Sequence, residues 1–192
     1  MLTVLLSLGG IFDVDRKERR LEEVNREVEN PELWDDPKRA QEISKEQKLL
    51  EDLVGSFKRL SAGITDAKEL EKHTYIKTRN PAVFPKKERL GLAQRMMNEA
   101  SDLVADLMEA NDLLLTDPEE RELRYRAQRS ALRNCRKLIH HIELAHEILS
   151  GFSDDAFAYW AKMAAGVKNQ TAKWYKTDKE RAAKLDAQKR HQ

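Results

Sequence analysis

Apolar residues recur every three or four positions along most of this 192-residue chain, and few glycines or prolines interrupt them. That spacing places them on one face of an α-helix, whereas a half-buried strand needs strict alternation. The sequence has 7 glycines, 5 prolines and 36% charged residues. Such a composition favours helices, because long straight side chains lose little rotamer freedom in them. We therefore predict an all-α protein.

The first third of the chain predicts a helical hairpin. A first helix is expected over residues 13–29, and Asn30-Pro31 should end it. Asn30-Pro31 and Asp36-Pro37 each combine a capping side chain with a proline at the first helical position, which is typical of a helix start, and a long second helix should begin at Pro37. We expect this helix to end at Gly63 and to pack antiparallel to the first.

The rest of the chain predicts an antiparallel up-and-down four-helix bundle over residues 71–176. A short helix near residues 64–80 should be followed by a break up to Pro85 and a helix that ends near Asn111. Asp117-Pro118 should start the longest helix, and Ser153 or Asp154 should start the last one. Residues 177–192 form a charged tail that is expected to fray. The second of these helices is expected to face inward with Leu90, Ala93, Met97, Ala100, Val104, Leu107 and Met108.

The net charge of +1 conceals an asymmetry along the chain. Residues 1–70 carry 12 Lys and Arg against 16 Asp and Glu, whereas residues 71–192 carry 23 against 18. An anionic partner should therefore prefer the second part. The single cysteine, Cys135, excludes an internal disulfide and fits a reducing cytoplasm. The apolar start, Met1 to Leu8, is too short for a signal peptide or a membrane span, so no membrane contact is expected.

Five stretches stand out within residues 8–70: Leu8 to Asp15, Arg20 to Asn25, Asn30 to Pro37, Lys38 to Gln41, and Asp66 to Leu70. In this order and spacing they resemble the N-terminal segment of the bacterial peptide-chain release factor 2 family. In that family the segment packs beside the base of the ribosomal stalk and does no chemistry. The resemblance implies that residues 1–70 form such a segment and contact the ribosome, and it is expected to stop near Leu70.

The residues with which that family acts on the ribosome are missing from these 192 residues. The family hydrolyses peptidyl-tRNA through a Gly-Gly-Gln loop and reads stop codons through a Ser-Pro-Phe tripeptide. Neither tripeptide occurs here, and the Gly9-Gly10 pair is followed by Ile11. We therefore expect no enzymatic activity and no cofactor.

A second resemblance begins after residue 70. It is carried by Phe84 to Leu92, by Glu109 to Asn111, by Leu132-Arg133 and, loosely, by Trp174 to Lys176. These stretches resemble a four-helix-bundle family. Its members are the accessory variability determinant of diversity-generating retroelements and the proteins encoded in intervening sequences of ribosomal RNA genes. The resemblance implies a ring-shaped homo-oligomer with a basic surface that binds nucleic acid and a reverse transcriptase.

The helix expected after Asp117 offers the best candidate binding surface. On a helical wheel Cys135 is at the centre of the apolar face, and a run of cations gathers on the opposite face. Arginine pairs with phosphate bidentately, so this stripe predicts contact with nucleic acid. The alternative is an ordinary solvated face. The stripe consists of Arg126, Arg129, Arg133, Arg136 and Lys137, with His140 beside them.

Two other basic groups are weaker candidates. Lys86, Lys87 and Arg89 follow a proline at a predicted helix start, where phosphate contact competes with the reading as ordinary surface. The lysines and arginines after Lys168 form either a non-specific electrostatic arm or a solubilising tail.

Metal binding and catalysis find little support in the sequence. Glu143 and His146 have the spacing of carboxylate-bridged di-iron bundles, but no second such motif occurs and Glu143 is off the apolar face. No metal site is therefore predicted. Cys135, at the centre of that face, is expected to be an inert buried thiol.

Three functions remain open at this point. The favoured one is a non-catalytic, oligomeric nucleic-acid-binding scaffold of the retroelement accessory type. The alternative is a truncated release-factor-2-like translation protein that contacts the ribosome without catalysing release. The third is a gene-insertion product with no selected function as a unit.

Overall fold

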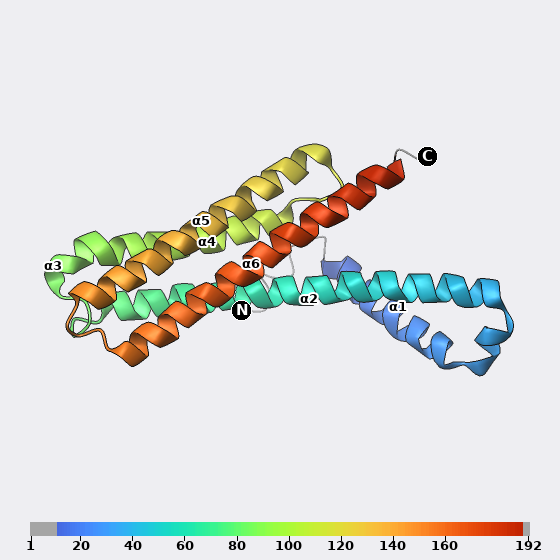
Figure 1. Ribbon diagram of the computed structural model, residues 1–192, viewed down its shortest axis with the longest axis horizontal. Helices are drawn as coiled ribbons and strands as arrows, with labels where there is room; N and C mark the ends of the chain where they lie inside the picture. Colours follow the sequence, from blue (N-terminus) through green and yellow to red (C-terminus); the bar gives the residue numbers. More distant parts are fainter. Residues whose placement is uncertain (1–10, 190–192) are drawn as a thin grey trace. The chain divides into compact units, whose positions relative to one another are not determined.

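The computed structural model describes residues 11–189, and this range contains helices and connecting turns but no strand. The prediction of an all-α protein is confirmed. Within the same range no helix is long and apolar enough to cross a membrane. The elements, labelled in Figure 1, are α1 (Ile11–Glu29), η2 (Pro31–Asp35), α2 (Pro37–Arg79), α3 (Lys86–Glu88), η3 (Arg89–Ala93), α4 (Gln94–Asp112), α5 (Pro118–Ile148) and α6 (Asp154–Lys189).

The expected cap–proline starts are confirmed. Asn30 Oδ1 accepts a hydrogen bond from the Glu32 amide at 3.1 Å, so η2 begins at Pro31. Asp36 caps α2 in the same way, through the amides of Lys38 and Arg39. At the start of α5, Asp117 Oδ1 accepts from two backbone amides, each at 2.9 Å. Each side chain satisfies helix amides that have no partner within the helix.

The expected end of a helix at Gly63 is wrong, because α2 continues through that position to Arg79. A glycine inside a helix costs only about 1 kcal/mol relative to alanine, which tertiary packing of an amphipathic helix readily offsets. A Cβ at this position would lie 2.9 Å from Gln170 Oε1 on α6. Glycine therefore permits close packing of α2 on α6. With 43 residues, α2 and not α5 is the longest helix.

The chain forms two compact units, residues 1–61 and 62–192, and α2 contributes to both. In the first unit, α1 and the first part of α2 form the predicted hairpin, joined by η2. Arg20 on α1 makes a bidentate contact with Glu46 on α2, at 2.8 and 3.0 Å. Gln47 donates to Asn25 Oδ1 at 2.9 Å. The apolar contact between the helices is small, and its buried side chains are Val24, Leu33, Ala40, Leu50 and Val54.

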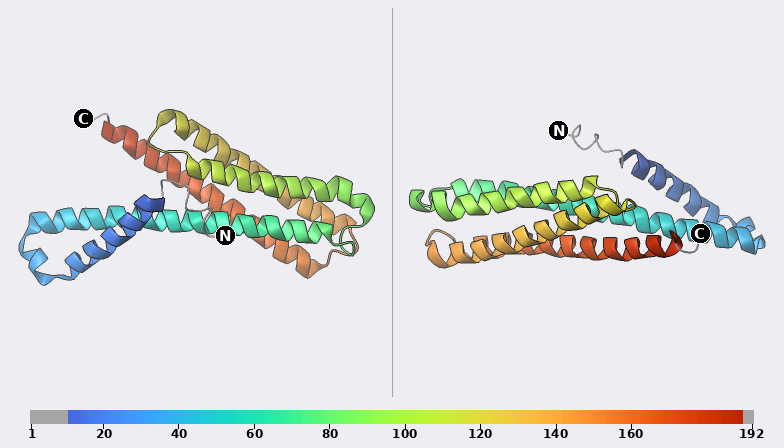
Figure 2. Two further views of the ribbon diagram at one scale, coloured as in Figure 1. Left: turned by 180° about the vertical axis from the view of Figure 1, so that it is seen from behind. Right: turned by 90° about the horizontal axis from the view of Figure 1, so that it is seen from above.

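The second unit is a bundle of four helices, made of the end of α2, α4, α5 and α6. Successive helices in this unit run in alternating directions (Figures 1 and 2). Trp160 on α6 is completely buried, and its indole nitrogen donates to Thr74 Oγ1 on α2 at 3.2 Å. Phe84 and Phe152 meet the same indole edge-on. Residues from all four helices thus share one core.

Two residues expected to face inward on the second bundle helix are exposed instead. Leu90 is 91% exposed and Met108 is 38% exposed. Near its start, between α3 and α4, this helix contains the π-helical turn η3, which holds more residues per turn than an α-helix and so shifts the buried face around Leu90. Leu92 and Met96 are buried as a result, and Leu90 points to solvent.

The expected fraying after Lys176 is also contradicted, because α6 continues to Lys189. Asp178 is 1% exposed and Ala182 is 4% exposed, so this part of α6 belongs to the core. Arg124 on α5 donates from Nε to Asp178 Oδ2 at 2.6 Å. Arg124 Nη1 donates to the carbonyls of Ala110 and Leu113, at 2.7 and 2.8 Å, where α4 ends. One guanidinium therefore links three helices.

Replacing Asp178 with asparagine tests this link. The side chain of Arg124 is 11% exposed, so Asp178→Asn leaves a buried cation without its counter-charge. We expect the free energy of unfolding to fall by about 3 kcal/mol in chemical denaturation. Glu180→Gln, two residues away on an exposed carboxylate, is the matched control and should change it by less than about 0.5 kcal/mol. Equal effects of the two changes would contradict the assignment.

A half-buried histidine, His73, predicts how the bundle responds to acid. His73 packs against the rings of Tyr159 and Trp160, and its Nε2 has no hydrogen-bond partner within the described residues. Burial, reinforced by the nearby Lys77, lowers the pKa of His73 below the ordinary value of 6.5. The unfolded chain therefore binds a proton more readily, and stability should be lost as the pH falls below 6.5. We expect His73→Phe to reduce the loss of melting temperature between pH 7.5 and 5.5; an unchanged loss would contradict this.

Candidate nucleic-acid interface

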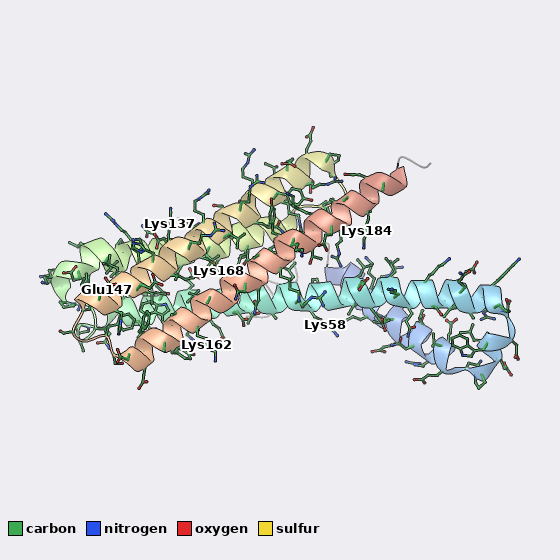
Figure 3. The ribbon with its side chains drawn as sticks, viewed as in Figure 1. Lys58, Lys137, Glu147, Lys162, Lys168 and Lys184 are labelled. Atoms are coloured by element: carbon green, nitrogen blue, oxygen red, sulfur yellow. The ribbon has the colours of Figure 1, made fainter. Side chains whose placement is uncertain are left out.

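The predicted basic stripe occupies the exposed face of α5. On the opposite face, Ala131, Cys135, Leu138 and Ile142 are buried in the core. With a rise of 1.5 Å per residue, the stripe extends for roughly 16 Å along the helix axis. Its members, all exposed, are Arg126, Arg129, Arg133, Arg136 and Lys137, and we refer to them as the α5 stripe. Lys137 is labelled in Figure 3.

The cations of the α5 stripe are not neutralised by carboxylates within residues 11–189. Arg129 Nη1 instead donates to the hydroxyl of Tyr175 at 3.4 Å, and Arg133 Nη2 donates to Ser130 Oγ at 3.1 Å. Two other arginines of the same helix behave differently, because Arg121 and Arg124 pair with aspartates of α6. The stripe therefore keeps its positive charge and most of its hydrogen-bond donors available to a partner.

The α5 stripe continues onto α6 through Tyr175. The ammonium of Lys179 lies 5.3 Å from the centre of the Tyr175 ring. The hydrogen bond from Arg129, together with Lys179, lowers the pKa of Tyr175, while partial burial opposes this. Of the basic residues expected in the tail, Lys176 contacts Glu180 at 3.9 Å and Lys168 is half-buried. Figure 3 shows Lys162, Lys168 and Lys184 at successive positions along α6.

The basic residues near Pro85 lie on separate elements, α3 and η3. Lys86 and Lys87 are exposed, and Lys87 contacts Glu88 at 3.8 Å. Arg89 is half-buried, and its Nε donates to the carbonyl of Phe84 at 3.2 Å. Arg89 thus stabilises the turn that precedes η3. The helical run that begins at Lys86 continues without a break through η3 into α4, so Lys86 and Lys87 lie at a helix N-terminus as expected, and phosphate contact there stays a prediction.

The histidines of α5 make pairs with carboxylates rather than a cluster. His141 Nδ1 lies 2.7 Å from Glu99 Oε2, and His146 Nε2 lies 2.8 Å from Asp154 Oδ1. Within the described residues no group of three His, Cys, Asp or Glu side chains is arranged to hold a metal ion. Burial raises the pKa of the Cys135 thiol to about 12, so the thiolate needed for nucleophilic chemistry is strongly disfavoured.

The buried polar side of α5 was not predicted from the sequence. Arg124 and Gln128 both donate to Asp178 Oδ2, and the Tyr125 hydroxyl lies 3.4 Å from the Asp178 carbonyl. The sequence did indicate that these two residues are buried, since Arg124 and Gln128 fall within about 20° of Cys135 on the helical wheel, at 100° per residue. A buried arginine needs an acidic partner. Finding that partner requires knowing which turn of α6 packs against α5.

Comparison with known proteins identifies the family. The model of the PCRF domain matches residues 17–123, which is more than half of the chain. The chain belongs to the PCRF domain family. This match continues past Leu70, where we expected the likeness to release factors to stop. It covers α1 from residue 17 onward, all elements from η2 to α4, and the start of α5 up to residue 123.

Relatives of this PCRF domain protein are release factors. The chain is 47% identical over 66 residues to peptide chain release factor 2 of Xanthomonas euvesicatoria pv. vesicatoria, covering 34% of this chain and 18% of the relative. It is 48% identical over 63 residues to the Aeromonas salmonicida protein and 47% over 64 residues to that of Bordetella pertussis, covering 33% of this chain and 17% of each. The chain thus spans less than a fifth of their length.

The second resemblance, to the four-helix-bundle proteins, is not supported by these comparisons. No solved structure matches the chain. The comparisons give no support to the likeness between residues 71–176 and the retroelement or ribosomal-gene bundle proteins. Most of α5 and all of α6 lie outside the PCRF match.

Proposed function

We propose that this chain is a non-catalytic, release-factor-like protein that associates with the ribosome through its PCRF part. The observation that carries the proposal is the PCRF match over residues 17–123, joined to 47% identity with a release factor 2 over 66 residues. The proposal excludes peptide release, since the 192 residues contain neither a Gly-Gly-Gln nor a Ser-Pro-Phe tripeptide. A cytoplasmic location follows from the same role.

The first unit has a suitable residue for such a contact. Trp34, in the turn between α1 and α2, is 58% exposed, whereas its neighbour Leu33 is buried. The contacts of Arg20 with Glu46 and of Gln47 with Asn25 hold together the two helices that this turn connects. Exposed tryptophans on a fixed support contribute strongly to binding, because they bury a large area at a low cost in side-chain entropy.

Sedimentation with ribosomes tests this proposal. We expect the full chain to pellet with purified bacterial 70S ribosomes through a sucrose cushion, and Trp34→Ala to weaken this about tenfold. Leu49→Ala is the matched control, because Leu49 is a similarly exposed apolar residue (61%) on α2. In a termination complex, the chain should release no peptide.

Two results would count against the proposal. If the full chain stayed in the supernatant at low and moderate salt, ribosome association would be wrong. If it stimulated peptide release, the non-catalytic assignment would be wrong.

A second candidate function, contact with nucleic-acid phosphates, is favoured by the α5 stripe. Its five exposed cations have no carboxylate partner within residues 11–189, although the chain has 34 acidic residues. A homo-oligomeric ring and a reverse-transcriptase partner rest on the second resemblance alone, and we do not extend the proposal to them.

Charge reversal tests the α5 stripe. We expect Arg129→Glu combined with Arg133→Glu and Arg136→Glu to abolish binding of a fluorescein-labelled RNA in anisotropy measurements at low salt. The control reverses Lys38, Lys45 and Lys48 on α2, which changes the net charge equally on another exposed surface. Binding unaffected by the first triple change, or lost equally with the second, would identify the stripe as a solvated face.

A further inference from the structure

Three donor groups converge where the α5 stripe meets α6. Arg129 Nη1 donates to the Tyr175 hydroxyl at 3.4 Å, and Lys179 Nζ lies 5.3 Å from the centre of the same ring. Arg129 is exposed on α5, Lys179 is exposed on α6, and Tyr175 is half-buried between them. The helical wheel of α5 alone did not indicate this arrangement, since two of the three groups belong to α6.

The donors of this group remain available to a ligand. The Tyr175 oxygen accepts from Arg129, so its own proton is free to point away from α5. A guanidinium has five N–H groups and an ammonium has three, and the contacts of Arg129 and Lys179 with the Tyr175 hydroxyl use only a minority of them. The group therefore offers two positive charges and a neutral hydroxyl donor within a small area, which suits an anion with several oxygens.

The nearby carboxylates do not compete for these cations. Asp178 precedes Lys179 in the sequence, but its side chain points into the core, where it accepts hydrogen bonds from Arg124 and Gln128. Glu180 contacts Lys176 on the exposed side of α6. The Arg124–Asp178 pair also sets the register of α6 against α5, because both partners are buried and neither can shift by a turn without losing the other.

We propose that Arg129, Tyr175 and Lys179 form one anion-binding site across α5 and α6, and that it takes a backbone phosphate of nucleic acid. This inference rests on the phosphate-binding role of the α5 stripe and adds α6 to it. The Tyr125 and Tyr175 rings meet nearly perpendicularly with centroids 5.6 Å apart, and the ammonium of Lys179 lies 5.3 Å from the centre of the Tyr175 ring, so we assign Tyr175 a role as a hydroxyl donor and not as a stacking platform. The site binds the backbone and reads no sequence.

The test uses the full chain and a fluorescein-labelled 20-nucleotide RNA of mixed sequence, with anisotropy measured over a range of salt concentrations. Arg129→Gln and Lys179→Gln should each weaken binding about tenfold, and the slope of log affinity against log salt should fall by about 1. Tyr175→Phe removes one neutral donor and should weaken binding about threefold to fivefold without changing the slope. Poly(U) of the same length should bind within threefold of the mixed RNA.

Lys162→Gln is the matched control, since Lys162 is an exposed lysine of α6, roughly 20 Å from Tyr175 at 1.5 Å per residue. It should change affinity less than twofold. In a double-variant cycle, Arg129→Gln with Lys179→Gln should weaken binding by less than the product of the single effects, because both groups contact one phosphate.

The outcomes separate this site from the wider proposal. If reversal of the stripe abolishes binding but Lys179→Gln and Tyr175→Phe behave like Lys162→Gln, the composite site is wrong and the α5 stripe stands. If the unaltered chain does not bind the RNA at low salt, both are wrong. Ribosome association through Trp34 is measured separately and is affected by neither result.

Discussion

The buried pair of Arg124 and Asp178 is the interaction on which the second unit depends most. Three of the four helices in that unit meet at this guanidinium, which satisfies two carbonyls where α4 ends and a carboxylate of α6. Apolar packing alone tolerates sliding of one helix along another, since one leucine can replace another in a groove. A buried charge does not, because a shift by one turn leaves it unpaired at a cost of several kcal/mol. The pair therefore fixes the register at which Tyr175 meets Arg129.

Local signals in the sequence predicted where helices begin, but they did not predict which residues of those helices contact other helices. The capping side chains of Asn30, Asp36 and Asp117 act within three residues, and all three predicted starts are confirmed. Gly63 failed as a helix end because a glycine inside a helix costs little, and its close approach to Gln170, more than a hundred residues away, cannot be seen in the local sequence. Leu90 failed because a π-helical turn changes the period on which the inward face was assigned.

The candidate site likewise has one part that the sequence predicted and one part that it did not. The exposure of the α5 stripe was predictable, since the position of Cys135 and its neighbours on a helical wheel fixes both faces of one helix. The contribution of α6 was not, because a charged stretch with few large apolar residues resembles a frayed tail when taken alone. Asp178 and Ala182 are buried only because α5 supplies a guanidinium and an apolar surface for them.

The ends of the family match do not coincide with the boundaries between the helices or between the two compact units. The PCRF match ends at residue 123, one residue before the guanidinium that joins α4, α5 and α6. The two compact units meet at residues 61 and 62, inside α2. A division at residue 70 would remove Ala67 and Leu70 from a core that they share with Trp160 and Met96. The PCRF match therefore reaches into the bundle, because α2 carries residues of the release-factor-like segment as well as Ala67 and Leu70 of the bundle core.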